Sequence, residues 1–183
     1  MNMKEIIKPA AVLLIITAIA AALLGAVESA TAPAIAEQNA KTQAAAMQAV
    51  FADAEEFAAV EGFEPTGKIV AVYEAIAGGE VSGYVINVKP DGFGGGIDTM
   101  VGIANDGTIT GLKVLSHSET PGLGAKATED SFQSQFAGKS GNVAVTKDGG
   151  EINSITSATI TSRAVANGAN EALQWFADNG GAK

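Results

Sequence analysis

A dense run of hydroxyl side chains lies near the C-terminus, in the segment Thr156–Ser162 (TSATITS). It follows a strand-like approach, Glu151–Ile155, and leads into a helical pattern from Arg163 to about Asn179. Hydroxyls at the start of a helix accept hydrogen bonds from the unpaired backbone N–H groups of the first turn. A helix N-terminus is also suited to bind an anion such as a phosphate. The run by itself therefore predicts either a capped helix or a phosphate site.

A second segment, Ser116–Lys126 (SHSETPGLGAK), also carries polar groups at a turn. It follows a strand candidate and precedes a short helix predicted near Thr128–Phe136. Within it, Thr120-Pro121-Gly122 encodes a turn. His117 and Glu119 are candidates for acid–base chemistry, but no second catalytic pair accompanies them. A turn that holds polar groups around a flat ligand needs no proton transfer.

Composition excludes several other kinds of site. The chain has no cysteine, which excludes disulfides, zinc thiolates, iron–sulfur clusters and thiol nucleophiles within it. Its single histidine rules out a histidine-rich metal site. The balance of 20 acidic against 11 basic residues argues against nucleic-acid binding. The glycines Gly94–Gly96 match neither a dinucleotide-binding pattern nor a phosphate-binding loop with its lysine, so they indicate a plain loop.

The elements that must position both segments form a sheet. From Lys68 the hydrophobic period changes from helical to strand-like, and short Gly- or Asn-containing turns separate the apolar runs. We expect an antiparallel meander with one face buried under the later helices, which is an α+β domain over residues 67–179. The strand candidates are Lys68–Ala75, Gly83–Val88, Ile97–Ala104 and Thr108–Leu115.

The N-terminus predicts a membrane anchor over residues 9–28. No residue from Pro9 to Val27 is charged, and this run spans roughly 28 Å as a helix, close to the thickness of the hydrocarbon core. Lys4 and Lys8 precede the run and Glu28 follows it, which predicts residues 1–8 in the cytoplasm and the remainder outside.

The alternative to a retained anchor is a cleaved secretory signal. Small residues at Ala30–Ala32 and Ala34–Ala36 would permit cleavage. The apolar run is longer than the roughly 7–15 residues of a usual signal core, which favours a retained helix. Either route places the domain on the far side of the cytoplasmic membrane.

Residues 29–66 are expected to connect the anchor to the domain. The part from Glu37 to about Glu61 is Ala-rich and is typical of a helix that leaves the membrane and docks on the domain. The alternative is a solvated stalk. Docking is favoured by an apolar stripe at helical spacing, which consists of Met47, Val50, Phe51, Ala54 and Phe57.

With these segments in view, the chain resembles the FMN-binding subunits of Rnf complexes and of Na⁺-translocating NADH:quinone oxidoreductases. The resemblance covers the whole chain and rests on two motifs, Ser116–Gly124 (SHSETPGLG) and Asn153–Thr159 (NSITSAT). The second is similar to the family's flavinylation signature, which is an acidic residue, two variable positions, Ser/Thr, Gly, Ala and Thr/Ser. Asn153 stands at the acidic position and Ser157 at the glycine position. The compact length and the first motif are more similar to the G subunit of Rnf than to the quinone-reductase C subunit.

The resemblance implies a covalently bound FMN. In the family, a separate flavin transferase esterifies the last Thr of the signature through the FMN phosphate, and this position maps to Thr159. Thr159 is then an acceptor and not a catalyst, with Thr161 and Ser162 as the nearest rival acceptors. The helix N-terminus would bind the phosphate, and Leu123 would contact the isoalloxazine ring. The expected cofactor-binding residues are Thr156, Ser157, Ala158, Thr159, Ile160 and Thr161 near the phosphate, and Glu119, Thr120, Gly122, Leu123, Gly124 and Lys126 along the ring.

The implied function is electron relay within an Rnf-type ferredoxin:NAD⁺ oxidoreductase coupled to Na⁺ or H⁺ transport. Partner membrane subunits would hold the chain in place, and it would be an electron carrier rather than a stand-alone enzyme. Two alternatives stay open. One is an exported flavin domain of another extracytoplasmic reductase. The other is an exported binding or scaffold module in which the hydroxyl run is only a helix cap.

Overall fold

The computed structural model describes residues 3–180, with side chains from Ile7 onward. The chain divides between Thr42 and Gln43 into two compact units. The first unit consists of most of helix α1 (Met3–Val50), which is long and apolar enough to cross a membrane, with a mean hydropathy of 2.7 in its most apolar window. The predicted N-terminal apolar helix is therefore confirmed, although the helix continues well beyond the expected anchor.

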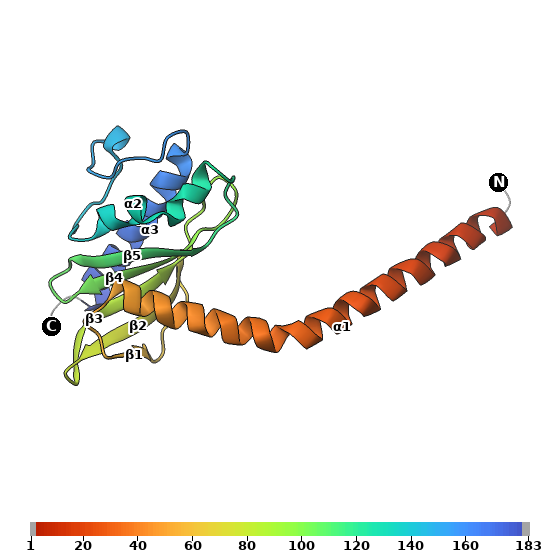
Figure 1. Ribbon diagram of the computed structural model, residues 1–183, viewed down its shortest axis with the longest axis horizontal. Coiled ribbons are helices and arrows are strands. Elements are labelled where there is room, and N and C mark those ends of the chain that lie inside the picture. The colour runs from red at the N-terminus through yellow and green to blue at the C-terminus, as the bar shows by residue number, and fades with distance from the viewer. Residues whose placement is uncertain (1–2, 181–183) are drawn as a thin grey trace. The chain divides into compact units, whose positions relative to one another are not determined.

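The second unit is built on a five-stranded antiparallel sheet whose strands lie in chain order (Figure 1). The predicted meander and the α+β class are confirmed. Tight turns separate the strands, because the chain reverses at Gly78-Gly79 and again at Asp106-Gly107. The strands are β1 (Glu56–Ala59), β2 (Ile69–Ala77), β3 (Glu80–Val88), β4 (Asp98–Ala104) and β5 (Ile109–Ser116).

Strand β1 lies where the sequence predicted the end of a helix. Helix α1 ends at Val50 rather than near Glu61, and Phe57 pairs with Ala75 of β2 instead of continuing the apolar helical stripe. The unpaired edge of β2 supplies backbone partners to this short segment, and these outweigh its helical spacing. Docking of the remaining stripe agrees with the structure, since Val50, Phe51 and Ala54 are buried against the sheet.

Each face of the sheet buries a separate set of side chains. On β3, Ile86 and Val88 belong to the larger core, whereas Val85 belongs to the smaller one beneath the end of α1. This alternation is the two-residue period of a strand. The larger core is closed by helix α2 (Asp130–Gln133) and helix α3 (Thr159–Trp175), which lie on the same side of the sheet (Figure 1).

Glycines allow the end of α1 to lie directly on the sheet. Gly102 of β4 pairs with Gly111 of β5 beneath Val50. A Cβ atom on Gly102 would come within 2.5 Å of the Val50 carbonyl oxygen, and one on Gly111 within 2.9 Å of its Cα. Thr110 Oγ1 donates a hydrogen bond to the same carbonyl, which fixes the last turn of the helix.

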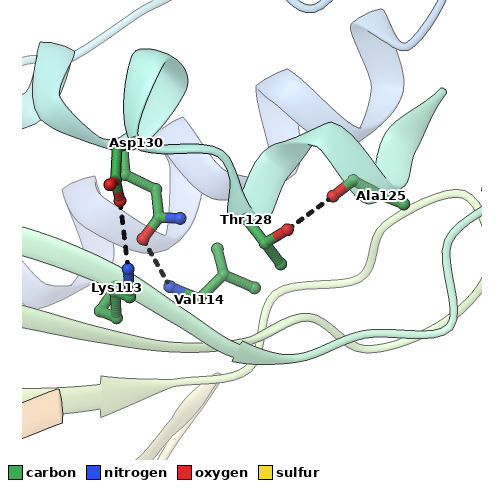
Figure 2. Close-up of polar contacts among 6 residues, drawn as sticks. Lys113, Val114, Ala125, Thr128 and Asp130 are labelled. Atoms are coloured by element: carbon green, nitrogen blue, oxygen red, sulfur yellow. Dashed lines mark hydrogen bonds and ion pairs between the residues drawn. The ribbon is translucent and has the colours of Figure 1, made fainter. Parts of the chain in front are cut away.

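The single helix expected at Thr128–Phe136 is divided into α2 and the 3-10 helix Ser134–Phe136, and another 3-10 helix, η1 (Gly124–Thr128), precedes them. Figure 2 shows polar contacts in this layer: Thr128 Oγ1 donates to the Ala125 carbonyl at 2.9 Å, and Lys113 reaches Asp130 at 3.2 Å. The first contact holds the end of the Ser116–Lys126 motif to the residues that follow it, and the second holds the start of α2 to β5.

Candidate functional site

Helix α3 begins inside the hydroxyl run, at Thr159 rather than at Arg163. Its N-cap residue is Ala158, whose methyl side chain cannot accept a hydrogen bond. Among the described residues, the first-turn N–H groups of Thr159, Ile160 and Thr161 have no side-chain acceptor. The structure therefore does not support a capping role for the run and leaves these donors free for an anion.

Two hydroxyls later in the run are directed into the protein. Ser162 is fully buried, where its Oγ donates to the Ala158 carbonyl and accepts from the Ile155 N–H, both at 2.9 Å. Thr161 is also buried, and its hydroxyl is donated to Glu119. The Ser162 hydroxyl holds the start of α3 to the preceding segment, whereas the Thr161 hydroxyl holds it to Glu119. The preceding segment forms only a single parallel bridge, Val145 to Ile152, instead of the expected strand.

Ser157 has a backbone conformation that favours glycine. Its φ of 63° is the only positive value for a non-glycine residue in the part of the chain that the structure describes. A left-handed residue is needed here because the chain makes a tight turn, in which the Ala158 N–H donates to the Ile155 carbonyl at 3.0 Å. This positive φ gives a physical reason for the glycine of the signature motif at this position. Ser157 adopts the left-handed conformation at a cost in backbone strain.

The Glu119 carboxylate joins three segments of the site. Its Oε2 accepts from Thr161 Oγ1 at 2.6 Å, and its Oε1 accepts from the Gly94 N–H at 2.9 Å. The side chain is buried, and glycines make the space that it fills: a Cβ on Gly124 would lie 2.3 Å from Oε2, and one on Gly92 would lie 2.3 Å from Oε1. Glu119 therefore organises the site through these contacts.

A cavity of about 370 Å³ opens at the start of α3, between the two motifs. Its walls are mainly apolar, and three large apolar side chains at it are exposed: Phe93, Ile160 and Leu123, at 70%, 54% and 42%. Exposed apolar side chains gathered at a cavity are typical of a ligand site. The lining residues are Phe93, Glu119, Thr120, Leu123, Gly124, Ser157, Ala158, Thr159, Ile160 and Thr161.

The cavity brings together nine of the twelve residues expected from the sequence. Thr156, Gly122 and Lys126 are exposed and do not line it. Phe93 was missed. The only signal for it was the neighbouring run Gly94–Gly96, where Gly94 packs against the Ser118 carbonyl and so brings the loop to the site.

Lys147 is a second residue that sequence reasoning missed. It lies in the 3-10 helix η3 (Thr146–Asp148), and its Nζ donates to Thr159 Oγ1 at 2.8 Å. The next residue, Asp148, accepts two hydrogen bonds from Arg163. These bonds, with the positive charges of Arg163 and Lys147, hold the pKa of Asp148 below the ordinary 3.8. No periodicity signals that a loop twelve residues before Thr159 returns to it.

The site suits a ligand that has a phosphate and a flat apolar body. Free backbone N–H groups and the Lys147 ammonium complement a phosphate beside Thr159. The exposed side chains of Phe93, Leu123 and Ile160 complement an aromatic ring system. This donor set fits FMN, which combines these two parts.

Comparison with known proteins gives matches at both ends of the chain. Residues 92–174 match the model of the FMN-binding domain, and residues 1–50 match the RnfG N-terminal region. The chain is 36% identical to the G subunit of the Na⁺-translocating ferredoxin:NAD⁺ oxidoreductase complex of Acetobacterium woodii, over 94% of this chain and 92% of that protein. It is also 36% identical to the G subunit of the ion-translocating oxidoreductase complex of Methanosarcina acetivorans, over 94% and 95%.

Two solved structures share the fold. The C subunit of the Na⁺-translocating NADH-quinone reductase from Parabacteroides distasonis aligns with a TM-score of 0.54 at 24% identity, covering 68% of this chain and 76% of that one. NqrC of Shewanella oneidensis aligns with a TM-score of 0.50 at 21% identity, covering 68% and 67%. At these identities the likeness concerns the fold of the domain.

Proposed function

Since the chain belongs to the family of G subunits of the Rnf-type ion-translocating oxidoreductase complexes, we infer that it carries FMN joined to Thr159 Oγ1 through the flavin phosphate. It is a membrane-anchored FMN electron-transfer subunit, and the other subunits of the complex are its partners. When bound, FMN supplies the redox chemistry, and the protein supplies binding, orientation and electrostatics.

The main support for Thr159 as the attachment site is the position of its hydroxyl group. Thr159 is the first residue of α3, is half-buried at the cavity wall, and accepts from the Lys147 ammonium at 2.8 Å. The rivals are less suited. Thr161 and Ser162 are 1% and 0% exposed with their hydroxyls already bonded, and Thr156 lies off the cavity.

The remaining contacts follow from this attachment. The first-turn N–H groups of α3 and Lys147 would hold the phosphate, which the helix dipole also favours. Leu123, Ile160 and Phe93 would contact the isoalloxazine ring, with Thr120 as a polar neighbour. Glu119 would act indirectly, because both of its oxygens are bonded within the protein. An exposed edge of the ring leaves a route for electrons to another subunit of the complex.

The orientation in the membrane is also part of the proposal. Lys4 and Lys8 before the apolar run and Glu28 after it support a cytoplasmic N-terminus and an FMN domain outside the cytoplasm. A covalent link suits that location, where free FMN is not reliably supplied, and a flavin transferase would act there. A reporter fused after Lys183 should be active only where exported proteins are, and activity in the cytoplasm instead would contradict this orientation.

The attachment is tested by producing the full chain together with a flavin transferase and running it on a denaturing gel. The wild type should give a fluorescent flavin band. Thr159→Ala should abolish the band, whereas the control Thr66→Ala should retain it, because Thr66 is exposed, belongs to neither motif and does not line the cavity. A fluorescent Thr159→Ala band would refute the site, and a wild type that stays dark would refute covalent attachment.

A further inference from the structure

Two consecutive residues of η3 contact two residues one turn apart on α3. Lys147 donates to Thr159 Oγ1 at 2.8 Å, and Asp148 accepts from Arg163 Nε at 2.6 Å, with a second bond from the other arm of the guanidinium. Residues four apart on a helix share a face, so η3 is held against α3 at two points. We propose that Lys147 orients the Thr159 hydroxyl for flavin attachment and afterwards neutralises the ester phosphate. This inference rests on the proposed function.

The charge of Lys147 is available for an anion. Each ion pair among the described residues joins a basic side chain to a carboxylate, whereas the hydrogen bond of Lys147 goes to a neutral hydroxyl. The neighbouring Arg163 is bound to Asp148 in the geometry of a bidentate pair. Lys147 therefore places a positive charge next to the Thr159 hydroxyl, the group that would become part of the phosphate ester.

The contact has a direct effect on the attachment chemistry. An ammonium has only donors, so the Thr159 proton must point away from Lys147, toward a base supplied by the transferase. The Oγ1–P bond forms as that proton leaves, and the anhydride bond of an activated flavin phosphate breaks, its leaving group taking the electron pair. No oxidation or reduction occurs. The ammonium stabilises negative charge that develops on Oγ1 and on the phosphoryl oxygens.

After attachment, the same ammonium faces a diester that keeps one negative charge. The phosphate then lies between Lys147 and the positive end of the α3 dipole. The Asp148–Arg163 pair acts as a positioning element, because it fixes the residue beside Lys147 to the same helix. Loss of that pair should weaken the effect of Lys147 without removing its charge.

The test measures the initial rate of flavin incorporation into the purified full-length chain in detergent, with a purified flavin transferase and its activated flavin nucleotide. Gel fluorescence and intact mass report the product. We expect Lys147→Met to slow incorporation by about tenfold or more and Lys147→Arg to retain it within about threefold, as for loss and retention of a charged hydrogen bond. The matched control is Lys139→Met, which removes another surface lysine, one paired with Glu151.

The outcomes separate this inference from the proposed function. A wild-type rate for Lys147→Met, with Thr159→Ala incorporating nothing, would overturn only the role of Lys147. Incorporation into Thr159→Ala at the wild-type rate would overturn the attachment site itself. Thermal unfolding of each variant before flavin addition shows whether it is folded. If Lys147→Met is unstable, the Lys147→Arg and Lys147→Gln pair decides, and equal rates for these two would refute the charge requirement.

Discussion

Thr161 donates its hydroxyl to Glu119 across 42 positions of sequence, at 2.6 Å and with both side chains buried. The bond joins the first turn of α3 to the turn that carries the Thr-Pro-Gly sequence. The other carboxylate oxygen holds the Gly94 N–H, so one side chain connects three walls of the cavity. The two sequence motifs are therefore parts of one structure.

Replacing Glu119 should disorganise the site. Glu119→Ala leaves the Thr161 hydroxyl and the Gly94 N–H without their buried partner, and we expect the free energy of unfolding to fall by about 2–3 kcal/mol. Glu119→Gln, which keeps an acceptor oxygen, should lose less. Thermal and denaturant unfolding of the full chain in detergent measures this. The exposed Glu64→Ala is the control and should change stability by less than about 0.5 kcal/mol. Equal stability of Glu119→Ala and wild type would show that the carboxylate does not hold the walls together.

Ser157→Gly should stabilise the protein. A left-handed conformation is costly for a residue with a Cβ atom, and glycine removes that cost at a φ of 63°. After the greater chain entropy of unfolded glycine is subtracted, we expect a gain of up to about 1 kcal/mol. The neighbouring Thr156→Gly should give no gain, because Thr156 lacks the positive φ. Destabilisation by Ser157→Gly would mean that the serine side chain makes a stabilising contact.

The meander was predictable because its strands combine two-residue alternation with clear turn residues, as at Gly78-Gly79. Strand β1 was not, since its four residues have little pattern of their own and pair with an edge that exists only in the fold. Helix α3 starts four residues before the predicted Arg163 because its hydroxyls are buried or directed into the cavity instead of capping it. The division of the chain at residue 67 stays a prediction.

The site was predictable where a motif covers it and not elsewhere. Both motifs contribute residues to the cavity, including Thr159 and Leu123. Phe93 and Lys147 come from loops whose paths depend on tertiary contacts, namely Gly94 against Ser118 and Arg163 with Asp148. Local sequence patterns do not indicate such tertiary contacts, so neither residue could be assigned to the site from the sequence.

The glycine pair under the end of α1 should not tolerate a side chain. In Gly102→Ala the new methyl meets the Val50 carbonyl at 2.5 Å and Thr110 Oγ1 at 2.4 Å, which forces backbone to move. We expect the free energy of unfolding to fall by about 1–3 kcal/mol, as it does when a well-packed core is overpacked. Gly25→Ala, where a Cβ meets nothing within 4 Å, is the matched control. Proteolysis near Val50 should increase only in Gly102→Ala. An unchanged cleavage pattern would contradict close packing of the helix end.

The Asp148–Arg163 pair should give a pH-dependent contribution to stability. The hydrogen bonds from Arg163 lower the pKa of Asp148 in the folded protein below the ordinary 3.8. A group with a lowered folded pKa stabilises above its unfolded pKa and loses that contribution as pH falls through the folded value. The difference in unfolding midpoint between wild type and Asp148→Asn should therefore be constant from about pH 5 to 7 and shrink below about pH 4. A difference that grows on acidification would contradict the pairing.

The attachment of FMN to Thr159 is tested most directly by peptide mass spectrometry of the flavinylated chain. Trypsin cuts after Lys147 and Arg163, so one peptide, Asp148–Arg163, holds every hydroxyl of the run. Fragmentation of that peptide should place a single flavin phosphate on Thr159, with Thr156, Ser157, Thr161 and Ser162 unmodified. A flavin phosphate on any of those four residues, or none on the peptide, would contradict the account.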